Sequence, residues 1–216
     1  MTAPGRDVVT TADNAVRGPI NALVFRVLDG YQHRMFGRRK RALFADLPDR
    51  VVEIGPGTGA NLRYYRPGTT VVAVEPNRHM HGPLAATAHR RGVDLAVRAA
   101  GAEDTGLPDA GVDAVVCTLV LCTVPDPAAA IAEIRRILRP GGRLLFLEHV
   151  HATGFHGLVQ RVVERPWRWF FEGCEVRRDT EAVLAAAGFT DLAVERYRAP
   201  SVFLPINPQI AGTATR

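Results

Sequence analysis

Three glycines at alternate positions, preceded by an acid, form the stretch of this sequence best suited to holding a small ligand. Residues 51–54 have the apolar character of a strand covered on both faces, and Glu53 lies within them. Gly55, Gly57 and Gly59 then let the backbone turn sharply and approach a ligand closely. The turn lacks the lysine of phosphate-binding loops, and Glu53 favours a ligand with a positive end, such as an α-ammonium group. A glycine turn of an ordinary α/β domain is the alternative.

A second acid, Glu75, ends the next apolar run, residues 70–74. At the end of the second strand of such a unit, a carboxylate can accept hydrogen bonds from both hydroxyls of a ribose. Farther along, Gly101 and Ala102 leave room for a flat ring such as adenine, and Glu103 or Asp104 can accept a hydrogen bond from its exocyclic amine. Taken alone, this last stretch would be an ordinary loop.

Histidine and cysteine side chains supply the remaining candidates for chemistry. His149 and His151 lie at the end of the fifth predicted strand and just after it. They are candidate general bases that could take a proton from a hydroxyl group of a substrate, with a structural role as the alternative. Cys117, Cys122 and Cys174 form neither a C-x-x-C pair nor a His/Cys metal pattern, so we expect no metal site. We interpret Cys122 and Cys174 as buried, unreactive thiols rather than nucleophiles. The odd, low number of cysteines favours a reducing compartment.

Composition indicates a globular domain and argues against two classes of partner. The 216 residues fit one domain, with 47% hydrophobic and 23% charged residues. The net charge of +5 could favour binding to nucleic acid, but the arginines are scattered apart from the run at 38–41. We interpret that run as a solvated helix face. No apolar stretch approaches the roughly 18 residues of a membrane span, and residues 1–13 lack the apolar core of a signal peptide. We expect a cytoplasmic monomer or homodimer with a small-molecule substrate, no nucleic-acid partner and no stable membrane insertion.

Strand and helix patterns alternate along the chain and predict an α/β fold built on a doubly wound sheet. After a loose tail at 1–13, helical spacing covers residues 14–47, broken into pieces by Gly30 and Gly37. Residues 140–142 should separate the last crossover helix from the fifth strand. The patterns predict strands at 51–54, 70–74, 94–98, 112–121, 143–150, 192–197 and 209–215, and further helices at 60–66, 77–91, 127–139 and 179–187.

One long segment, residues 151–178, interrupts the alternation and is rich in aromatic residues. Ligands of such sheets bind at the carboxyl ends of the strands, so this insertion would cover the mouth of the site. Aromatic side chains at a mouth suit an apolar substrate, and Trp167 and Phe171 are candidate substrate contacts together with Cys122. A capping helix with its own small core is the alternative. The helices at 14–47 could cover the same mouth or pack against the sheet edge.

Several of these stretches together resemble the class I S-adenosylmethionine-dependent methyltransferases, in particular the small enzymes of the type-11 group. The resemblance covers about residues 50–216 and rests on residues 51–59, 75–77, 102–104, 107–108 and 138–143. It implies a single methyltransferase domain with a Rossmann-like, seven-stranded sheet, N-terminal helices and a helical cap insertion at 151–178. It also implies S-adenosyl-L-methionine as the cofactor.

A narrower similarity links the chain to the microsomal alkyl thiol S-methyltransferases. It rests on residues 59–61, 116–124, 148–150 and 172–174. The chain departs from that family in two respects. We find no counterpart of its N-terminal membrane-anchoring segment, and Glu75 replaces an aspartate, a change that keeps the ribose contact. Bacterial type-11 enzymes of unassigned substrate share much of the same pattern.

The resemblance implies that the glycine turn passes beneath the methionine part of the cofactor, with Glu53 behind the turn and reaching its ammonium side directly or through water. Glu75 would hold the ribose, Ala102 and Glu103 would flank the adenine, and backbone groups at Cys117 and Thr118 would meet the methionine end. The complete set implied for the cofactor is Glu53, Gly55, Gly57, Gly59, Glu75, Pro76, Ala102, Glu103, Cys117 and Thr118.

The expected activity is methylation of a small, mostly apolar acceptor, with thiol sulfur as the leading candidate. A thiol with a pKa near ~8.5 is already partly ionised at neutral pH and needs no protein base. O-, N- or C-methylation of a natural product, quinone or lipid is the alternative among enzymes, and a non-catalytic cofactor binder is a further class. A nucleic-acid methyltransferase is disfavoured, because residues 117–120 lack the N-P-P-Y-type tetrapeptide of enzymes that flip out a base.

Overall fold

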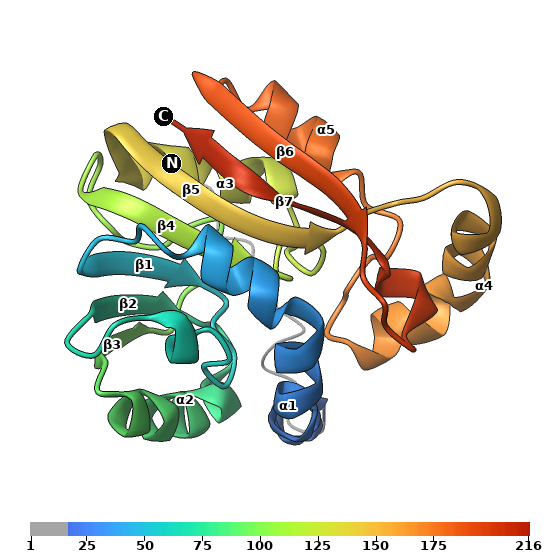
Figure 1. The fold of residues 1–216 in the computed structure, drawn as a ribbon, viewed down its shortest axis with the longest axis horizontal. Helices are drawn as coiled ribbons and strands as arrows, with labels where there is room; N and C mark the ends of the chain where they lie inside the picture. Colours follow the sequence, from blue (N-terminus) through green and yellow to red (C-terminus); the bar gives the residue numbers. More distant parts are fainter. Residues whose placement is uncertain (1–16) are drawn as a thin grey trace, which may run out of the picture.

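The computed structural model describes residues 17–216, in which seven strands form one mixed sheet (Figure 1). The strand order is β3-β2-β1-β4-β5-β7-β6, with β1 to β5 parallel and β7 antiparallel to both of its neighbours. The predicted doubly wound, seven-stranded fold is confirmed. The expected tail and the start of the first helix at residue 14 lie outside the described residues.

The strands are β1 (Arg50–Ile54), β2 (Thr70–Val74), β3 (Asp94–Arg98), β4 (Val112–Thr118), β5 (Leu138–His149), β6 (Asp191–Arg198) and β7 (Pro208–Thr215). The α-helices are α1 (Arg17–Leu43), α2 (Arg78–Arg91), α3 (Pro127–Ile137), α4 (Gly154–Phe170) and α5 (Thr180–Ala186). Two 3₁₀ helices complete the set, η2 (Leu62–Tyr64) and η3 (Leu204–Ile206).

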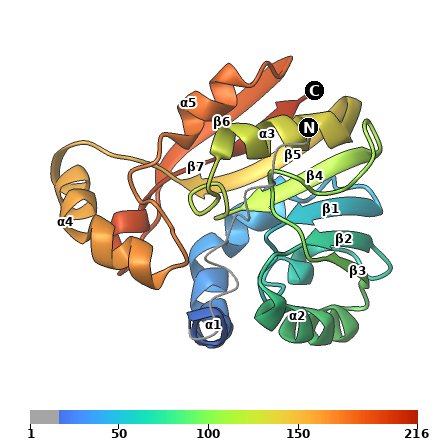
Figure 2. The ribbon, with the colours of Figure 1, turned by 180° about the vertical axis from the view of Figure 1, so that it is seen from behind.

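Alternate side chains of the parallel strands supply a separate apolar core on each face of the sheet. One core packs Phe146 of β5 against Ile134 of α3 and Leu184 of α5. The other packs Val116 of β4 together with Leu84 of α2. Figures 1 and 2 show α1 in front of one face and α3 and α5 in front of the other. Burial on both faces explains the nearly continuous apolar runs of the central strands and holds their ends in place.

Side-chain caps fix where three helices begin, as the sequence indicates. Asn77, Asp126 and Asp179 each accept hydrogen bonds from backbone N–H groups of the first helical turn. Gly92 then ends α2 in the left-handed conformation, with φ of 65°. Because α2 follows β2 and α3 follows β4, two of these caps also set the path of the chain at the strand ends.

The N-terminal region is one continuous helix, so the expectation that Gly30 and Gly37 would divide it is wrong. A glycine inside a helix costs only about 1 kcal/mol, which packing can outweigh. A Cβ at Gly37 would lie 2.9 Å from His33 Nδ1 and 3.1 Å from the Tyr64 hydroxyl. The glycine therefore leaves room for the 2.7 Å hydrogen bond between His33 and Tyr64, which joins α1 to η2.

Two other boundaries differ from the expected ones. β5 begins at Leu138, so residues 140–142 lie inside the strand instead of before it. The pairing of β4 with β5 shifts register between Val112 and Ala114, and such irregularities accommodate proline and glycine in a strand. Residues 60–66 contain only the short η2 where an α-helix was expected.

The segment between β5 and α5 is a helical extension beside the sheet, built from α4. It packs against η3, and Figure 1 shows both on the side toward which the arrowheads of β4 and β5 point. Among the helices of residues 17–216, none has both the length and the apolar character needed to cross a bilayer.

Candidate active site

Two adjoining pockets lie at the carboxyl ends of the parallel strands. The larger, of about 210 Å³, is the polar pocket, and its walls include Gly57, Asn61, Glu75, Ala102, Glu103 and Thr118. The smaller, of about 90 Å³, is the aromatic pocket, and its walls include Phe25, Tyr31, Phe36, His149, Trp167 and Phe203. Phe25, Gln32, Leu119, Thr123 and Phe171 line both. A ligand in one pocket would therefore face a ligand in the other.

The glycine turn after β1 forms the floor of the polar pocket at Gly57. Its φ is +57°, and no atom lies within 4 Å of the position that a Cβ would occupy, so that position is open. A Cβ on Gly55 would instead lie 2.6 Å from the Val120 side chain. Gly59 does not line the pocket, because its Cβ position faces Leu62 in the core. The three glycines thus do three different things, and Gly57 is the one that leaves space for a ligand.

Glu75, just past the end of β2, places a carboxylate at the wall of the polar pocket. Its Oε2 accepts from the Gly57 N–H at 3.0 Å and its Oε1 from the Asn77 N–H at 2.9 Å. The side chain is buried, with 6% of the residue exposed, and burial raises the pKa of Glu75. A carboxylate oxygen has two lone pairs, so each oxygen can still accept from a ligand hydroxyl.

A chain of hydrogen bonds among mostly buried side chains lies at the end of the polar pocket near β1 and β4. Lys40 of α1 donates from Nζ to Asn61 Oδ1 at 2.7 Å. Asn61 Nδ2 donates to Glu53 Oε1 at 2.8 Å and to Thr118 Oγ1 at 2.9 Å, and Tyr65 donates to Glu53 Oε2 at 2.7 Å. Burial lowers the pKa of Lys40 to about 8, although Glu53 opposes the shift. Lys40 is 4% exposed and lines the pocket, so the solvated face expected for residues 38–41 is wrong at this position.

Glu53, expected behind the glycine turn, and Cys117, expected to contribute backbone groups, have their side chains behind this wall. Glu53 does not line the polar pocket, and each of its oxygens already accepts from a neighbour, so it would act through Asn61 and Lys40. Burial raises the pKa of Glu53. Cys117 is fully buried in β4, with Sγ 3.8 Å from Glu148 Oε1. Its side chain does not reach the pocket, whereas Thr118, one residue later, does.

The loop after β4 stands between the two pockets in a strained conformation. Leu119 has a φ of +58°, a region that side-chain-bearing residues rarely adopt. Buried Glu148 holds the loop by accepting N–H groups of Val120 at 2.9 Å and Leu121 at 3.1 Å. Burial raises the pKa of Glu148 to about 7. The strain lies at a residue that lines both pockets, as is common at functional sites.

The other end of the polar pocket is formed by the loop after β3. Ala102 and Glu103 line it as the sequence indicates, with Ala102 buried. Glu103 Oε1 also accepts from the Asp126 N–H at 3.2 Å. Across the pocket, Glu172, which follows α4, accepts from Asn77 Nδ2 at 2.9 Å. The segment after α4 therefore contacts the elements that carry Glu75.

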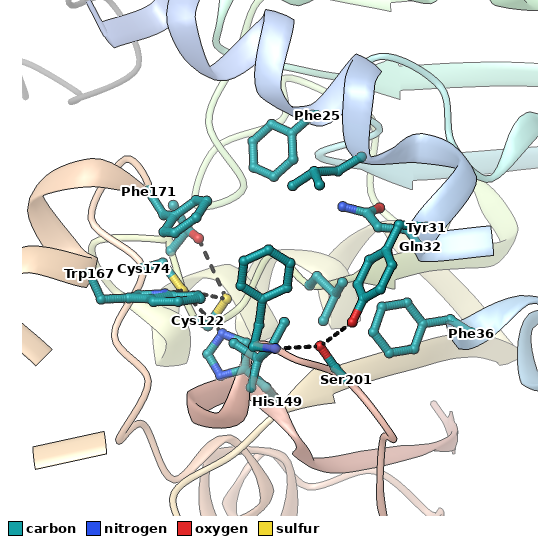
Figure 3. Close-up of a pocket in the computed structure, with 15 residues that line it drawn as sticks. Phe25, Tyr31, Gln32, Phe36, Cys122, His149, Trp167, Phe171, Cys174 and Ser201 are labelled. Atoms are coloured by element: carbon teal, nitrogen blue, oxygen red, sulfur yellow. Dashed lines mark hydrogen bonds between the residues drawn. The ribbon is translucent and has the colours of Figure 1, made fainter. Parts of the chain in front are cut away.

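The aromatic pocket is walled by rings from three separate segments (Figure 3). The rings of Trp167 and Phe171 lie 4.4 Å apart, and those of Tyr31 and Phe203 lie 5.7 Å apart. The Tyr31 hydroxyl donates to Ser201 Oγ at 2.9 Å. No aspartate, glutamate, lysine or arginine side chain of residues 17–216 lines this pocket. The two predicted substrate contacts at Trp167 and Phe171 lie in its wall.

Cys122, His149 and Cys174 meet at one side of the aromatic pocket (Figure 3). His149 Nε2 lies 3.1 Å from Cys174 Sγ, which lies 3.6 Å from Cys122 Sγ. Contact with Cys174, together with burial, raises the pKa of the Cys122 thiol well above its usual range. His151, the other histidine proposed as a base, is exposed and lines neither pocket. The structure therefore brings only one of the two histidines to the site.

The sequence of this chain is similar to those of proteins named for their activity. Residues 52–146 match the family described as methyltransferase domain. The human thiol S-methyltransferase TMT1B is 36% identical over 203 residues, covering 88% of this chain and 83% of the relative. The human thiol S-methyltransferase TMT1A is 35% identical over 192 residues, covering 82% and 78%.

The chain belongs to the thiol S-methyltransferase family.

Solved structures of other methyltransferases share the fold of this family member. A SAM-dependent methyltransferase of Thermotoga maritima is 22% identical, with a TM-score of 0.63, and the match covers 91% of this chain and 94% of that one. Phosphoethanolamine N-methyltransferase 2 of Haemonchus contortus, in complex with S-adenosyl-L-methionine, has a TM-score of 0.62 at 16% identity, covering 83% and 52%.

Several pocket residues of this methyltransferase were not found by sequence reasoning. Lys40 and Asn61 of the polar pocket were not proposed for the site, and neither were the rings that α1 and the segment before η3 contribute to the aromatic pocket. The spacing of residues along the first helix could have indicated that Lys40 is buried. Phe36, Lys40 and Phe44 follow one another at intervals of four residues, and all three are buried.

Proposed function

We propose that this chain transfers a methyl group from S-adenosylmethionine to the sulfur of a small, apolar thiol. The observation that carries the proposal is the pair of adjoining pockets, one polar and one aromatic, which meet at Leu119 and Phe171. The human relatives named thiol S-methyltransferase, at 35% and 36% identity over most of the chain, support the same reaction.

The polar pocket fits S-adenosylmethionine from end to end in the order of the strands. The amino-acid end would lie between β1 and β4, where Lys40 offers an ammonium group to the carboxylate. The ribose would lie over the end of β2, where Glu75 has free lone pairs for its hydroxyls. The adenine would lie beside Ala102 and Glu103, after β3. Gly57 leaves the space under the ligand open.

The cofactor supplies the electrophile, a methyl group on a sulfonium. The residues of the chain bind it, orient it and exclude water, and orientation alone can be worth several kcal/mol. Leu119 and Thr123 line both pockets, so they define where the methyl donor and the acceptor atom meet.

The lining of the aromatic pocket suits a thiol better than an alcohol. Its rings offer an apolar surface, and among residues 17–216 no carboxylate or lysine lines it. His149, the candidate base in its wall, has Nε2 in contact with Cys174 Sγ at 3.1 Å. A thiol ionises far more readily than an alcohol and its thiolate is a strong nucleophile. The three cysteines are free thiols, which fits the proposed reducing, cytoplasmic compartment. A monomer or homodimer stays a prediction.

The test is a product assay with S-adenosylmethionine labelled in its methyl group. Benzenethiol and benzyl mercaptan are compared with phenol, benzyl alcohol and benzylamine, with an RNA as a further acceptor, and mass spectrometry locates the label. We expect thioether products from both thiols and none from the matched alcohols. Label on oxygen or nitrogen with both thiols inert would reject the sulfur acceptor and leave methyl transfer in place.

A further inference from the structure

The aromatic pocket contains a cluster whose chemistry the methyl-transfer geometry does not use. Cys122 follows β4, His149 ends β5 and Cys174 follows α4, and their ligand atoms all lie within 4.8 Å of one another. The three residues are 1%, 2% and 7% exposed. Figure 3 shows the two sulfur atoms and the imidazole on the same side of the cavity.

We propose that Cys122, His149 and Cys174 bind a zinc ion whose fourth position is filled by the sulfur of the acceptor thiol. The inference rests on the proposed thiol methylation and adds to it a means of holding and ionising the acceptor. Two cysteines, one histidine and one open position form a donor set that occurs in catalytic zinc sites.

The two shortest contacts of the cluster are close to the separations expected around one tetrahedral ion, and all its ligand atoms lie within 4.8 Å of one another. Two sulfurs at about 2.3 Å from a tetrahedral zinc lie about 3.8 Å apart, and a sulfur and an imidazole nitrogen lie about 3.6 Å apart. The observed separations are 3.6 Å between Cys174 Sγ and Cys122 Sγ and 3.1 Å between Cys174 Sγ and His149 Nε2. The sulfur–sulfur separation is already close to the zinc value, and a shift of about half an ångström at His149 would bring the sulfur–nitrogen separation to it.

The surroundings of the cluster also fit a metal better than a set of packed thiols. The Trp167 indole N–H donates to Cys174 Sγ at 3.3 Å, and a metal-bound thiolate is a better acceptor than a neutral thiol. His149 Nδ1 is buried and has no hydrogen-bond partner among the described residues, so the imidazole is oriented by its contact with the cluster itself, through Nε2 and Cys174 Sγ at 3.1 Å. Each ligand also comes from a different stretch that carries the narrower resemblance, namely 116–124, 148–150 and 172–174.

The open position faces the space where an acceptor would bind, because all three ligands line the aromatic pocket. An incoming R–SH would lose its proton to solvent as its sulfur binds the zinc. The sulfur then forms a bond to the methyl carbon while the bond from that carbon to the sulfonium breaks. The products are R–S–CH₃ and S-adenosylhomocysteine, and the thioether leaves the zinc because it is a poorer ligand than a thiolate.

Metal content tests the site without relying on activity. The full chain, produced with zinc in the medium, is compared with Cys174→Ser, His149→Gln and the matched control Cys117→Ser, whose sulfur is buried outside the cluster. Inductively coupled plasma mass spectrometry should find about one zinc per chain in the wild type and in the control, and less than about a tenth of that in the two ligand variants. Wild-type protein without zinc, or carrying a Cys122–Cys174 disulfide, would overturn the proposal.

Cobalt(II) tests the open position. Protein loaded with Co²⁺ should show sulfur-to-metal charge-transfer absorption, and benzenethiol should change that spectrum while phenol leaves it unchanged. Chelation should lower benzenethiol methylation at least tenfold, and added zinc should restore it. A metal-free chain that still methylates thiols at the full rate would reject the zinc site and leave the proposed function standing. A metal-loaded chain that methylates only alcohols or amines would reject the thiol acceptor instead.

Discussion

The polar and aromatic pockets are formed by different kinds of structural element. The polar pocket is made of strand ends, a glycine turn and buried polar groups that hydrogen-bond to one another. The rings of the aromatic pocket come mainly from α1, the end of α4 and the segment around η3, and the loop after β4 and the end of β5 complete its wall. These elements also expose apolar residues on their outer surfaces, with Val27, Val162 and Val202 between 70% and 77% exposed. The half of the site that would hold the cofactor therefore relies mainly on strand ends, whereas the rings of the half that would hold the acceptor come from elements beside the sheet.

The largest effect should come from Gly57→Val. The branched side chain would fill the floor of the polar pocket, and at φ +57° it also adds strain of about 1–2 kcal/mol. We expect S-adenosylmethionine binding to disappear in calorimetry. Gly68→Val is the matched control, because Gly68 has φ +84° and an open Cβ position but lies in an exposed turn outside both pockets. Equal loss of binding in the two variants would mean that strain, and not filling of the pocket, is responsible.

Substitution of Glu75 should weaken cofactor binding without abolishing it. Loss of two charge-assisted hydrogen bonds to the ribose predicts that Glu75→Ala lowers affinity by roughly 2–4 kcal/mol. Glu75→Gln keeps the shape of the side chain and one acceptor oxygen, so its effect should be smaller. Calorimetry measures both variants, with Glu164→Gln on α4 as the control. Unchanged affinity in Glu75→Ala would remove the ribose from this end of the pocket.

Trp167→Ala should weaken acceptor binding and leave cofactor binding nearly unchanged. Its ring lines only the aromatic pocket, so the variant should raise KM for benzenethiol about tenfold or more, corresponding to loss of roughly 1–2 kcal/mol of apolar contact. The cofactor Kd should stay within about twofold. Trp169→Ala is the matched control on the same helix, because Trp169 is 66% exposed and lines neither pocket. A large change in cofactor Kd in Trp167→Ala would show that the two halves are coupled.

The smallest effect concerns pH and Lys40. Because burial lowers the pKa of Lys40 to about 8, its ammonium group loses the proton as pH rises through that value. If it binds the cofactor carboxylate, wild-type affinity should fall between pH 7 and 9 more steeply than that of Lys40→Met. The amino group of the cofactor titrates in both proteins, so the difference between the two curves isolates Lys40. Parallel curves would place the carboxylate elsewhere.

The cofactor half could be predicted from sequence because its residues follow the strands directly. Glu75 directly follows β2, Ala102 and Glu103 lie in the loop after β3, and the sheet topology brings such positions to one edge. Gly59 and Glu53 belonged to the same motif, but its pattern does not tell which residue faces the ligand and which faces the core.

The acceptor half was predicted only in part, because distant segments form it. Trp167 and Phe171 were recognisable in an aromatic stretch, whereas Tyr31 and Phe203 meet through tertiary packing of α1 against the segment near η3. His151 was chosen for its position beside His149, yet its side chain is exposed. The segments that separate Cys122, His149 and Cys174 in the sequence conceal their proximity, since the usual metal patterns have ligands only a few residues apart.

Phe171 and Glu172 have a kinetic consequence. Phe171 lines both pockets, and Glu172 lines the polar pocket while it accepts a hydrogen bond from Asn77, beside Glu75. A cofactor in the polar pocket and an acceptor in the aromatic pocket would therefore both rest against this one short segment. The segment would be held in place from both sides only when the two ligands are bound together, so each ligand should slow the release of the other.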